Sequence, residues 1–324
     1  MKKISGLLLL VLLAFTLSGC EKAVEEISFK VIAPIGSPAL AQTYMESTLP
    51  SLGDHVTYEI EVVSGTDPLI AAFASGTHEI IYAPTNLGAK LISTGLEYQF
   101  AGTVVWGNLY LATGTDDAFS MSDLDGKEIV AFGQNSTPDI VLQTILADQT
   151  FTTAPTITYV DSAGTALATL AADPTKIVML AEPVLSVAAL PSKVANLKSI
   201  DLQVAWEDMT GDSSYPQAGI FVKTGFDSTV LDDYLAQVVE SINQAATDPA
   251  GVAQMAVDLD YGFPLPVLTS AIPRSNLMFK SALDSKDALE KYFGYIMDFN
   301  PVLIGGSLPD EDFYYVSTSV YRTS

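Results

Sequence analysis

The sequence predicts an α/β protein made of two similar lobes, and three observations lead to this fold class. From Ile27 onward, strand and helix patterns alternate, which is typical of an α/β fold with a mainly parallel sheet. The stretches 68–84 and 165–183 share one order of features: a helix, a tight turn, a buried strand and then proline. Two extended runs, 98–113 and 216–223, can carry the chain from one lobe to the other and back.

The elements of the first lobe follow from local composition. We expect strands at 28–35, 56–63 and 79–83 and helices at 38–49, 68–74 and 86–93. Proline at the first helical position and β-branched residues in the strands support these assignments. The run 98–113 is longer than a usual strand of about five or six residues, so it can leave one sheet and enter another region.

A second unit begins after the turn signal at 122–127. We expect strands at 128–132, 156–160 and 177–180, a polar loop at 133–138 that opens a helix ending at 147, and helices at 164–172 and 184–190. Beyond Gly225 the sequence is mostly helical, most clearly at 231–246 and 285–299.

The first 20 residues have the form of a secretory signal. Lys2 and Lys3 precede the apolar run 6–19, which is shorter than the roughly 20 apolar residues that span a bilayer. Leu17-Ser18-Gly19-Cys20 resembles the lipobox of bacterial lipoproteins, in which the cysteine is lipidated and becomes the first mature residue. The alternative is a buried free cysteine that ends a hydrophobic helix, but the chain turns polar immediately afterwards. We therefore expect a signal peptide at 1–19, a lipid anchor at Cys20 and a linker at 20–27, on the extracytoplasmic face of the bacterial membrane.

Composition limits the partners. The 15 Lys and Arg against 38 Asp and Glu give a net charge of −23, which becomes −25 once Lys2 and Lys3 leave with the signal. Such a surface argues against nucleic acid, whose phosphates need basic side chains. Cys20 is the single cysteine, so no disulfide is expected. With 324 residues and 48% hydrophobic composition, the chain can bury more than one core.

An ordered set of short motifs resembles one family over nearly the whole mature chain. The set comprises Gly36-Ser37-Pro38, the stretches 83–90, 106–111, 123–129, 133–138 and 272–276, and Glu182-Pro183. It resembles the ABC-transporter substrate-binding lipoproteins of the type II periplasmic-binding-protein fold, in the nitrate, sulfonate and thiamine-precursor class (NitT/TauT family). The resemblance implies lobe 1 at 28–111 and 218–324, lobe 2 at 112–217, two hinge strands, and a small ligand held in the cleft. It also implies delivery of the ligand by a monomeric receptor to an ABC permease.

Three predicted helix starts share a design that suits a binding cleft. Ser37-Pro38, Asp67-Pro68 and Thr137-Pro138 each place a capping side chain before a proline. Each follows a predicted strand, and open α/β sheets bind ligands at the carboxyl ends of their strands. The free N–H groups and partial positive charge of such helix starts suit carboxylate, sulfonate or carbonyl oxygens. Capping alone is the alternative.

Polar residues near these helix starts are the first candidate ligand contacts. Lobe 2 offers Asn135, Ser136 and Thr137 beside a glycine, which is more polar groups than a cap needs. Lobe 1 offers Ser37, Thr85 and Asn86, with structural capping as the alternative for the last two.

Three aromatic residues and one carboxylate complete the candidate set. Tyr82, Trp106 and Tyr215 could stack on a planar ligand, with a core role as the alternative for Trp106 and a hinge role for Tyr215. Glu182 follows a buried run and needs a partner, either a cationic or N–H-bearing ligand or a local backbone cap. Arg274 could bind a ligand carboxylate or form a surface or interlobe salt bridge. Because arginine is scarce in the candidate loops, we favour a neutral or mildly cationic planar heterocycle, with a small organic acid as the alternative.

Catalysis and metal binding have little support in the sequence. His55 and His78 are the only histidines, both expected at the surface, and neither has spaced metal-ligating companions. The same scarcity disfavours Ser-His-Asp hydrolysis, and phosphate-loop and dinucleotide motifs are absent. We therefore expect a solute-binding protein with no cofactor, no metal and no enzymatic activity. The alternatives are an extracytoplasmic sensor or surface-binding lipoprotein, and an enzyme of this fold, which would need a histidine-rich iron site.

Overall fold

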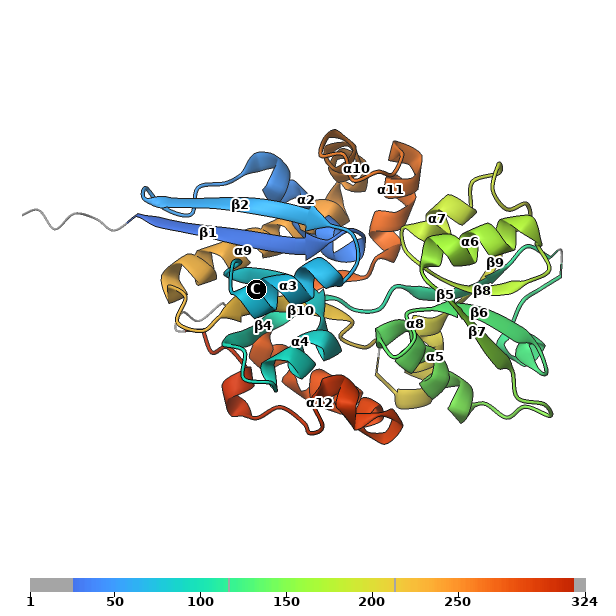
Figure 1. The fold of residues 1–324 in the computed structure, drawn as a ribbon. Helices are drawn as coiled ribbons and strands as arrows, with labels where there is room; N and C mark the ends of the chain where they lie inside the picture. Colours follow the sequence, from blue (N-terminus) through green and yellow to red (C-terminus); the bar gives the residue numbers. More distant parts are fainter. Residues whose placement is uncertain (1–25, 116, 213, 318–324) are drawn as a thin grey trace, which may run out of the picture.

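The chain folds into two α/β lobes that lie side by side and are joined by two crossovers (Figure 1). The computed structural model describes residues 26–115, 117–212 and 214–317. The predicted signal peptide, Cys20 and most of the predicted linker therefore lie outside the described residues. Among those residues, no helix has the length and apolar character needed to cross a membrane.

The first lobe contains a six-stranded sheet of order β11-β4-β10-β3-β1-β2. Its strands are β1 (Ile27–Pro34), β2 (Val56–Val63), β3 (Ile80–Pro84), β4 (Tyr98–Val105), β10 (Ala218–Lys223) and β11 (Leu277–Ser281). Its helices are α2 (Ser37–Thr48), α3 (Asp67–Ser75), α4 (Thr85–Ile92), α9 (Ser228–Thr247), α10 (Pro249–Asp258), α11 (Leu265–Ala271) and α12 (Ala282–Phe299). Residues of α2 and α9 pack on one face of the sheet, while α3, α4 and α12 pack on the other.

The second lobe contains a five-stranded sheet of order β7-β6-β8-β5-β9. Its strands are β5 (Leu109–Thr113), β6 (Glu128–Phe132), β7 (Thr156–Val160), β8 (Ile177–Ala181) and β9 (Lys198–Asp201). The α-helices α5 (Thr137–Asp148) and α8 (Leu202–Thr210) cover one face, and α6 (Ala163–Ala172) and α7 (Val184–Ala188) cover the other. Short 3-10 helices are η1 (Met121–Leu124), η2 (Ile272–Arg274), η3 (Pro301–Ile304) and η4 (Glu311–Phe313).

The long extended run 98–113 is two strands in two different sheets. β4 lies in the first sheet and β5 in the second, so the first crossover is 106–108. The lobe boundary therefore differs from the expected one after residue 111, because β5 pairs with β8 and β9 from Leu109 onward. The second crossover follows α8 and includes residues 214–217, and β10 begins at Ala218.

Both sheets are mixed, and most strands in each sheet point in one direction, as expected. β1 pairs in parallel with β2 and β3, and β6 pairs in parallel with β7 and β8. The strands next to the crossovers, β4, β5 and β10, pair antiparallel with their neighbours. β5 and β10 run opposite to the parallel strands of their sheets because each carries the chain away from a crossover. β4 runs toward the first crossover, in the same direction as β1, β2 and β3.

The hydrophobic core continues from one lobe into the other. Trp206 of α8 packs edge-on against Tyr292 of α12, with ring centroids 5.9 Å apart. Tyr215, from the second crossover, stacks on Tyr292 at 5.9 Å. All three rings are at most 2% exposed, so apolar packing as well as the two crossovers holds the lobes together.

Candidate functional site

Polar residues at the ends of strands from both sheets are buried against one another between the lobes. Ser37 and Asn86 belong to the helices that follow β1 and β3, while Thr137 and Glu182 follow β6 and β8. These four residues are at most 4% exposed. We name them, together with Asn108 of the first crossover, the interlobe polar cluster. The carboxyl ends of parallel strands are the usual place for a ligand site in such sheets.

One contact of this cluster is a direct hydrogen bond between the lobes. Thr137 Oγ1, at the start of α5, donates to Asn86 Oδ1, at the start of α4, over 2.9 Å. Asn86 Nδ2 donates in turn to the carbonyl of Leu303 over 3.5 Å. The lobes are therefore closed in this conformation, because two candidate ligand contacts satisfy each other.

Asn108 links both lobes and both crossovers. Its Nδ2 donates to Ser37 Oγ over 2.7 Å and to the carbonyl of Glu182 over 3.4 Å. Its Oδ1 accepts from Gln217 Nε2 over 2.7 Å, and its amide donates to Gln217 Oε1 over 3.1 Å. Neither Asn108 nor Gln217 was predicted as a site residue from the sequence. Asn108 does lie within the stretch 106–111, which is part of the family resemblance.

Glu182 has the local backbone cap that was one of its two alternatives, and Arg274 is a second partner. Its Oε2 accepts from the amide of Ser186, and its Oε1 lies 3.1 Å from Arg274 Nε. Arg274 belongs to the other lobe, so the interlobe salt bridge is present. Burial raises the pKa of the Glu182 carboxyl above its ordinary value, while hydrogen bonding to Ser186 and the charge of Arg274 oppose the increase.

The helix starts that face the other lobe do not have the expected side-chain caps. Ser37, Asp67 and Thr137 are the first helical residues, and Gly36, Thr66 and Ser136 occupy the capping positions without a side-chain cap hydrogen bond. Side-chain caps occur instead at α6, α8, α9, α10 and α12. Capping therefore does not explain Ser37 and Thr137, whose hydroxyls make the interlobe contacts.

Asp139, another residue that was not expected from the sequence, places a buried carboxylate in the first turn of α5. It is 1% exposed and accepts hydrogen bonds from the amide of Asn135, from Gln143 Nε2 and from the hydroxyl of Tyr159. Its charge already balances the partial positive charge at this helix start. An anionic ligand group beside Thr137 would therefore meet a nearby negative charge.

The other two loop candidates of lobe 2, Ser136 and Asn135, are less buried than Thr137. Ser136 is half-buried, and its Oγ donates to the carbonyl of Gly133 over 2.7 Å. Asn135 is exposed, with a left-handed backbone of φ 59°. Of the three predicted contacts, Thr137 is the one that the structure brings to the other lobe.

Four other candidate residues, from lobe 1 and from the crossovers, make hydrogen bonds within the protein around the interlobe polar cluster. Tyr82 lies in the core with its hydroxyl 2.9 Å from that of Tyr234, and Thr85 Oγ1 donates to the carbonyl of Pro216 over 2.6 Å. Tyr215 donates to Gln203 Oε1 over 3.0 Å. The ring of Trp106 donates to the carbonyl of Met278 over 2.9 Å and lies under Lys280 Nζ at 4.5 Å.

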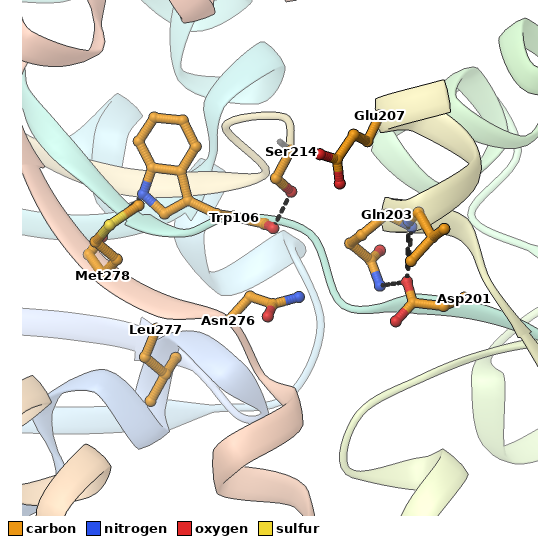
Figure 2. A pocket seen from close by; sticks show the side chains of 9 residues that line it. Trp106, Asp201, Gln203, Glu207, Ser214, Asn276, Leu277 and Met278 are labelled. Atoms are coloured by element: carbon orange, nitrogen blue, oxygen red, sulfur yellow. Dashed lines mark hydrogen bonds between the residues drawn. The ribbon is translucent and has the colours of Figure 1, made fainter. Parts of the chain in front are cut away.

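A cavity of about 410 Å³ lies beside the crossovers (Figure 2). Figure 2 shows Trp106 and Met278 on one side and Asp201, Gln203 and Glu207 on the other, with Ser214 between them. Asp201 and Glu207 give this space an acidic wall, and Gln203 Nε2 donates to Asp201 Oδ1 over 2.7 Å. The size falls within the range of small-molecule sites.

The described residues contain no group of three or more His, Cys, Asp or Glu that could hold a metal ion. His78 differs from the surface position that we expected, because it is 9% exposed and lies 3.3 Å from Glu61 Oε2.

Comparison with solved structures assigns the fold class. The chain is similar to an ABC transporter structure from Parabacteroides distasonis, with a TM-score of 0.79 and 22% identity over 90% of this chain and 99% of that chain. It is also similar to the periplasmic aliphatic sulphonate binding protein of Escherichia coli, with a TM-score of 0.69 and 13% identity over 91% and 94% of the two chains. A Candida albicans protein described as having the generic periplasmic binding protein fold gives a TM-score of 0.57 and 14% identity over 88% and 92%. The chain therefore has the two-lobed periplasmic-binding-protein fold.

No protein-family model and no curated protein sequence matches the chain.

Proposed function

We propose that this chain is an extracytoplasmic solute-binding protein that closes its lobes around a small organic ligand and delivers the ligand to an ABC permease. The observation that carries the proposal is the interlobe polar cluster, in which Ser37 and Asn86 of one lobe are buried against Thr137 and Glu182 of the other. The role is binding without catalysis, and the working form is a monomer.

Lobe separation would make these polar groups available to a ligand. The Thr137 to Asn86 hydrogen bond and the Glu182 to Arg274 ion pair join residues of different lobes, so opening breaks both. Buried polar groups are costly without partners, and a solute that offers donors and acceptors can replace the broken contacts. A ligand that contacts both lobes stabilises the closed form by its differential affinity for that form.

The similar structures support this function, because they include an ABC transporter and a periplasmic sulphonate binding protein. For this chain we propose a planar heterocycle or a small organic acid as the ligand, held by Ser37, Asn86 and Thr137. Asn135 and Ser136 stay candidates at the edge of the same site.

A thermal-shift screen tests the proposal. The purified chain is mixed with vitamins, pyrimidines, sulfonates and amino acids, and a ligand at 100 times its Kd should stabilise the fold by about 2.7 kcal/mol. The Asn86→Ala/Thr137→Ala variant should lose the shift. Thr158→Ala, which removes an exposed hydroxyl bound to Glu128, should keep it. The absence of a shift with every compound in the panel would contradict the function.

The proposed membrane attachment needs a separate test. Cells that express the chain are grown with labelled palmitate, and the label should appear on the protein and disappear in Cys20→Ser. Equal labelling of both proteins would exclude Cys20 as the anchor. Ligand uptake that depends on the chain would then separate transport from a sensor or surface-binding role.

A further inference from the structure

Glu182 is a buried carboxylate with incomplete hydrogen bonding. Its side chain is 0% exposed, and its Oε2 accepts from the amide of Ser186 over 3.1 Å. Its Oε1 lies 3.1 Å from Arg274 Nε, but the pair does not have hydrogen-bond geometry. Glu182 Oε1 therefore has unused capacity for a hydrogen-bond donor at this point between the lobes.

Arg274 compensates the Glu182 charge through a single nitrogen. An arginine that is held firmly by a carboxylate uses two parallel N–H donors, whereas the contact here is through Nε. The side chain is 37% exposed, and its guanidinium carbon lies 5.2 Å from the centre of the Tyr110 ring. The guanidinium therefore lies between the buried carboxylate and solvent, and it can leave the carboxylate without crossing the core.

The charge balance near this pair is negative. Burial raises the pKa of the Tyr110 hydroxyl to about 12, the charges of Asp201 and Glu182 add to the increase, and the charge of Arg274 opposes it. Lobe 2 has a second buried carboxylate, Asp139, in the first turn of α5, the helix whose Thr137 contacts the other lobe. A solute with a positive charge would improve this balance, and an anionic solute would worsen it.

We propose that a cationic, N–H-bearing group of the solute takes the place of the Arg274 guanidinium against Glu182, and that Arg274 is a built-in counter-ion displaced by the solute. This inference rests on the proposed solute-binding function and names its substrate class. A bare buried carboxylate would be strongly unfavourable, and Arg274 compensates the charge of Glu182 in this conformation. A planar group with two N–H donors, such as an amidine, can bind the carboxylate in a bidentate manner and return Arg274 to water.

Three molecules of nearly equal shape test the charge preference: benzamidine, benzamide and benzoate, which are cationic, neutral and anionic. Their binding to the purified full chain is measured by calorimetry at one ionic strength. We expect benzamidine to bind about tenfold more tightly than benzamide, and benzoate to bind most weakly. In Glu182→Gln the preference for benzamidine should disappear. In Glu128→Gln, which changes an exposed carboxylate of the same lobe, it should persist.

The direction in which Arg274→Ala changes the affinity for benzamidine distinguishes two roles of Arg274, a counter-ion that the ligand displaces and a residue that binds the ligand. Removal of a competitor should increase benzamidine affinity severalfold. Lys291→Ala removes the same charge from the ion pair between α12 and Asp212 and should leave the affinity unchanged. If Arg274→Ala does not fold, the Glu182→Gln series still decides the question.

The inference is wrong if benzamide or benzoate binds as well as benzamidine, or if benzamidine does not bind at about 10 mM. It is also wrong if Arg274→Ala weakens the binding of benzamidine. In those cases the solute-binding function stands as long as another compound class shifts the melting temperature. A panel in which neutral, anionic and cationic compounds all fail contradicts the function itself.

Discussion

Thr137 Oγ1 donates a 2.9 Å hydrogen bond to Asn86 Oδ1, so the first residue of α5 in one lobe holds the start of α4 in the other. Both side chains are buried, and Thr137 has no capping role that would keep its hydroxyl in place without Asn86. This contact marks the closed conformation and can be removed with little change of shape.

Thr137→Val should shift the lobes toward an open form. Valine keeps the size of threonine but cannot donate, and a buried hydrogen bond contributes about 1 kcal/mol, which corresponds to roughly a fivefold change in the closed-to-open ratio. Small-angle X-ray scattering should report a larger radius of gyration. Thr158→Val, on the surface of lobe 2, should leave the radius unchanged; equal radii for all three proteins would show that this bond does not maintain closure.

Gly107→Ala should destabilise the first crossover. Gly107 has a φ of +80°, and an added Cβ would lie 2.7 Å from Gln203 Cγ. Gly211 has a φ of +75°, and a Cβ added there would have no atom within 4 Å, so Gly211→Ala has the backbone strain without the collision. Urea denaturation should show a loss of about 1–3 kcal/mol for Gly107→Ala beyond the loss for Gly211→Ala. Identical losses would mean that the crossover tolerates the contact.

Asp139→Asn should weaken lobe 2. The carboxylate accepts three hydrogen bonds while buried, and an asparagine nitrogen cannot accept. We expect a loss of about 1–3 kcal/mol in the free energy of unfolding. Asp148→Asn, at the exposed end of the same helix, should change it little. A small effect at both positions would indicate that the loop before α5 can rearrange.

The Glu182 carboxyl should make stability depend on pH in a predictable direction. Burial raises its pKa in the folded protein, so its protonated form is favoured by folding. As pH rises from about 4 through the raised pKa, the wild type should lose stability relative to Glu182→Gln, which cannot ionise. Denaturation midpoints measured across this range check the trend.

The stability difference between the wild type and Glu128→Gln should change with pH in the opposite direction. The hydrogen bond from Lys176 lowers the pKa of Glu128, so its contribution is present at neutral pH and is lost as pH falls through the lowered pKa. The wild type should therefore gain stability relative to Glu128→Gln as pH rises. If the stability differences of Glu182→Gln and Glu128→Gln from the wild type change with pH in the same direction, the raised pKa of Glu182 is contradicted.

Local sequence predicted most of the helices and strands because their signals are short-range. β2, β6 and β7 have the predicted ends, and α2 and α3 begin within one residue of their prolines. The missed strands, β9 and β11, are edge strands of their sheets. β9 is the four-residue Lys198–Asp201, whose polar composition has no strand pattern of its own. Pairing with β5 fixes it as a strand.

The candidate site was less predictable because polar residues near a helix start look alike in a sequence. Ser37, Asn86, Thr137 and Glu182 were candidate ligand contacts, with capping as the alternative for Asn86 and Glu182. In the structure Thr137 bonds to Asn86, and Asn108 bonds to both Ser37 and Glu182. Tyr82 and Thr85 come from the same segment as Asn86 but satisfy the core and the second crossover. Asn108 and Asp139 had no distinguishing pattern, since their importance depends on partners far away along the chain.

The sequence by itself determined the α/β class, the two-lobed plan and the segments that supply polar groups to the cleft, because strand period, proline position and composition are local properties. Tertiary structure alone decided the antiparallel crossover strands, the interlobe pairing of Thr137 with Asn86, and the Arg274 partner of Glu182. The two interlobe pairs join residues 51 or more positions apart, so they exist only once both lobes have folded and closed. The charge preference of the site follows from that closure, because burial is what makes the Glu182 carboxylate require a cation.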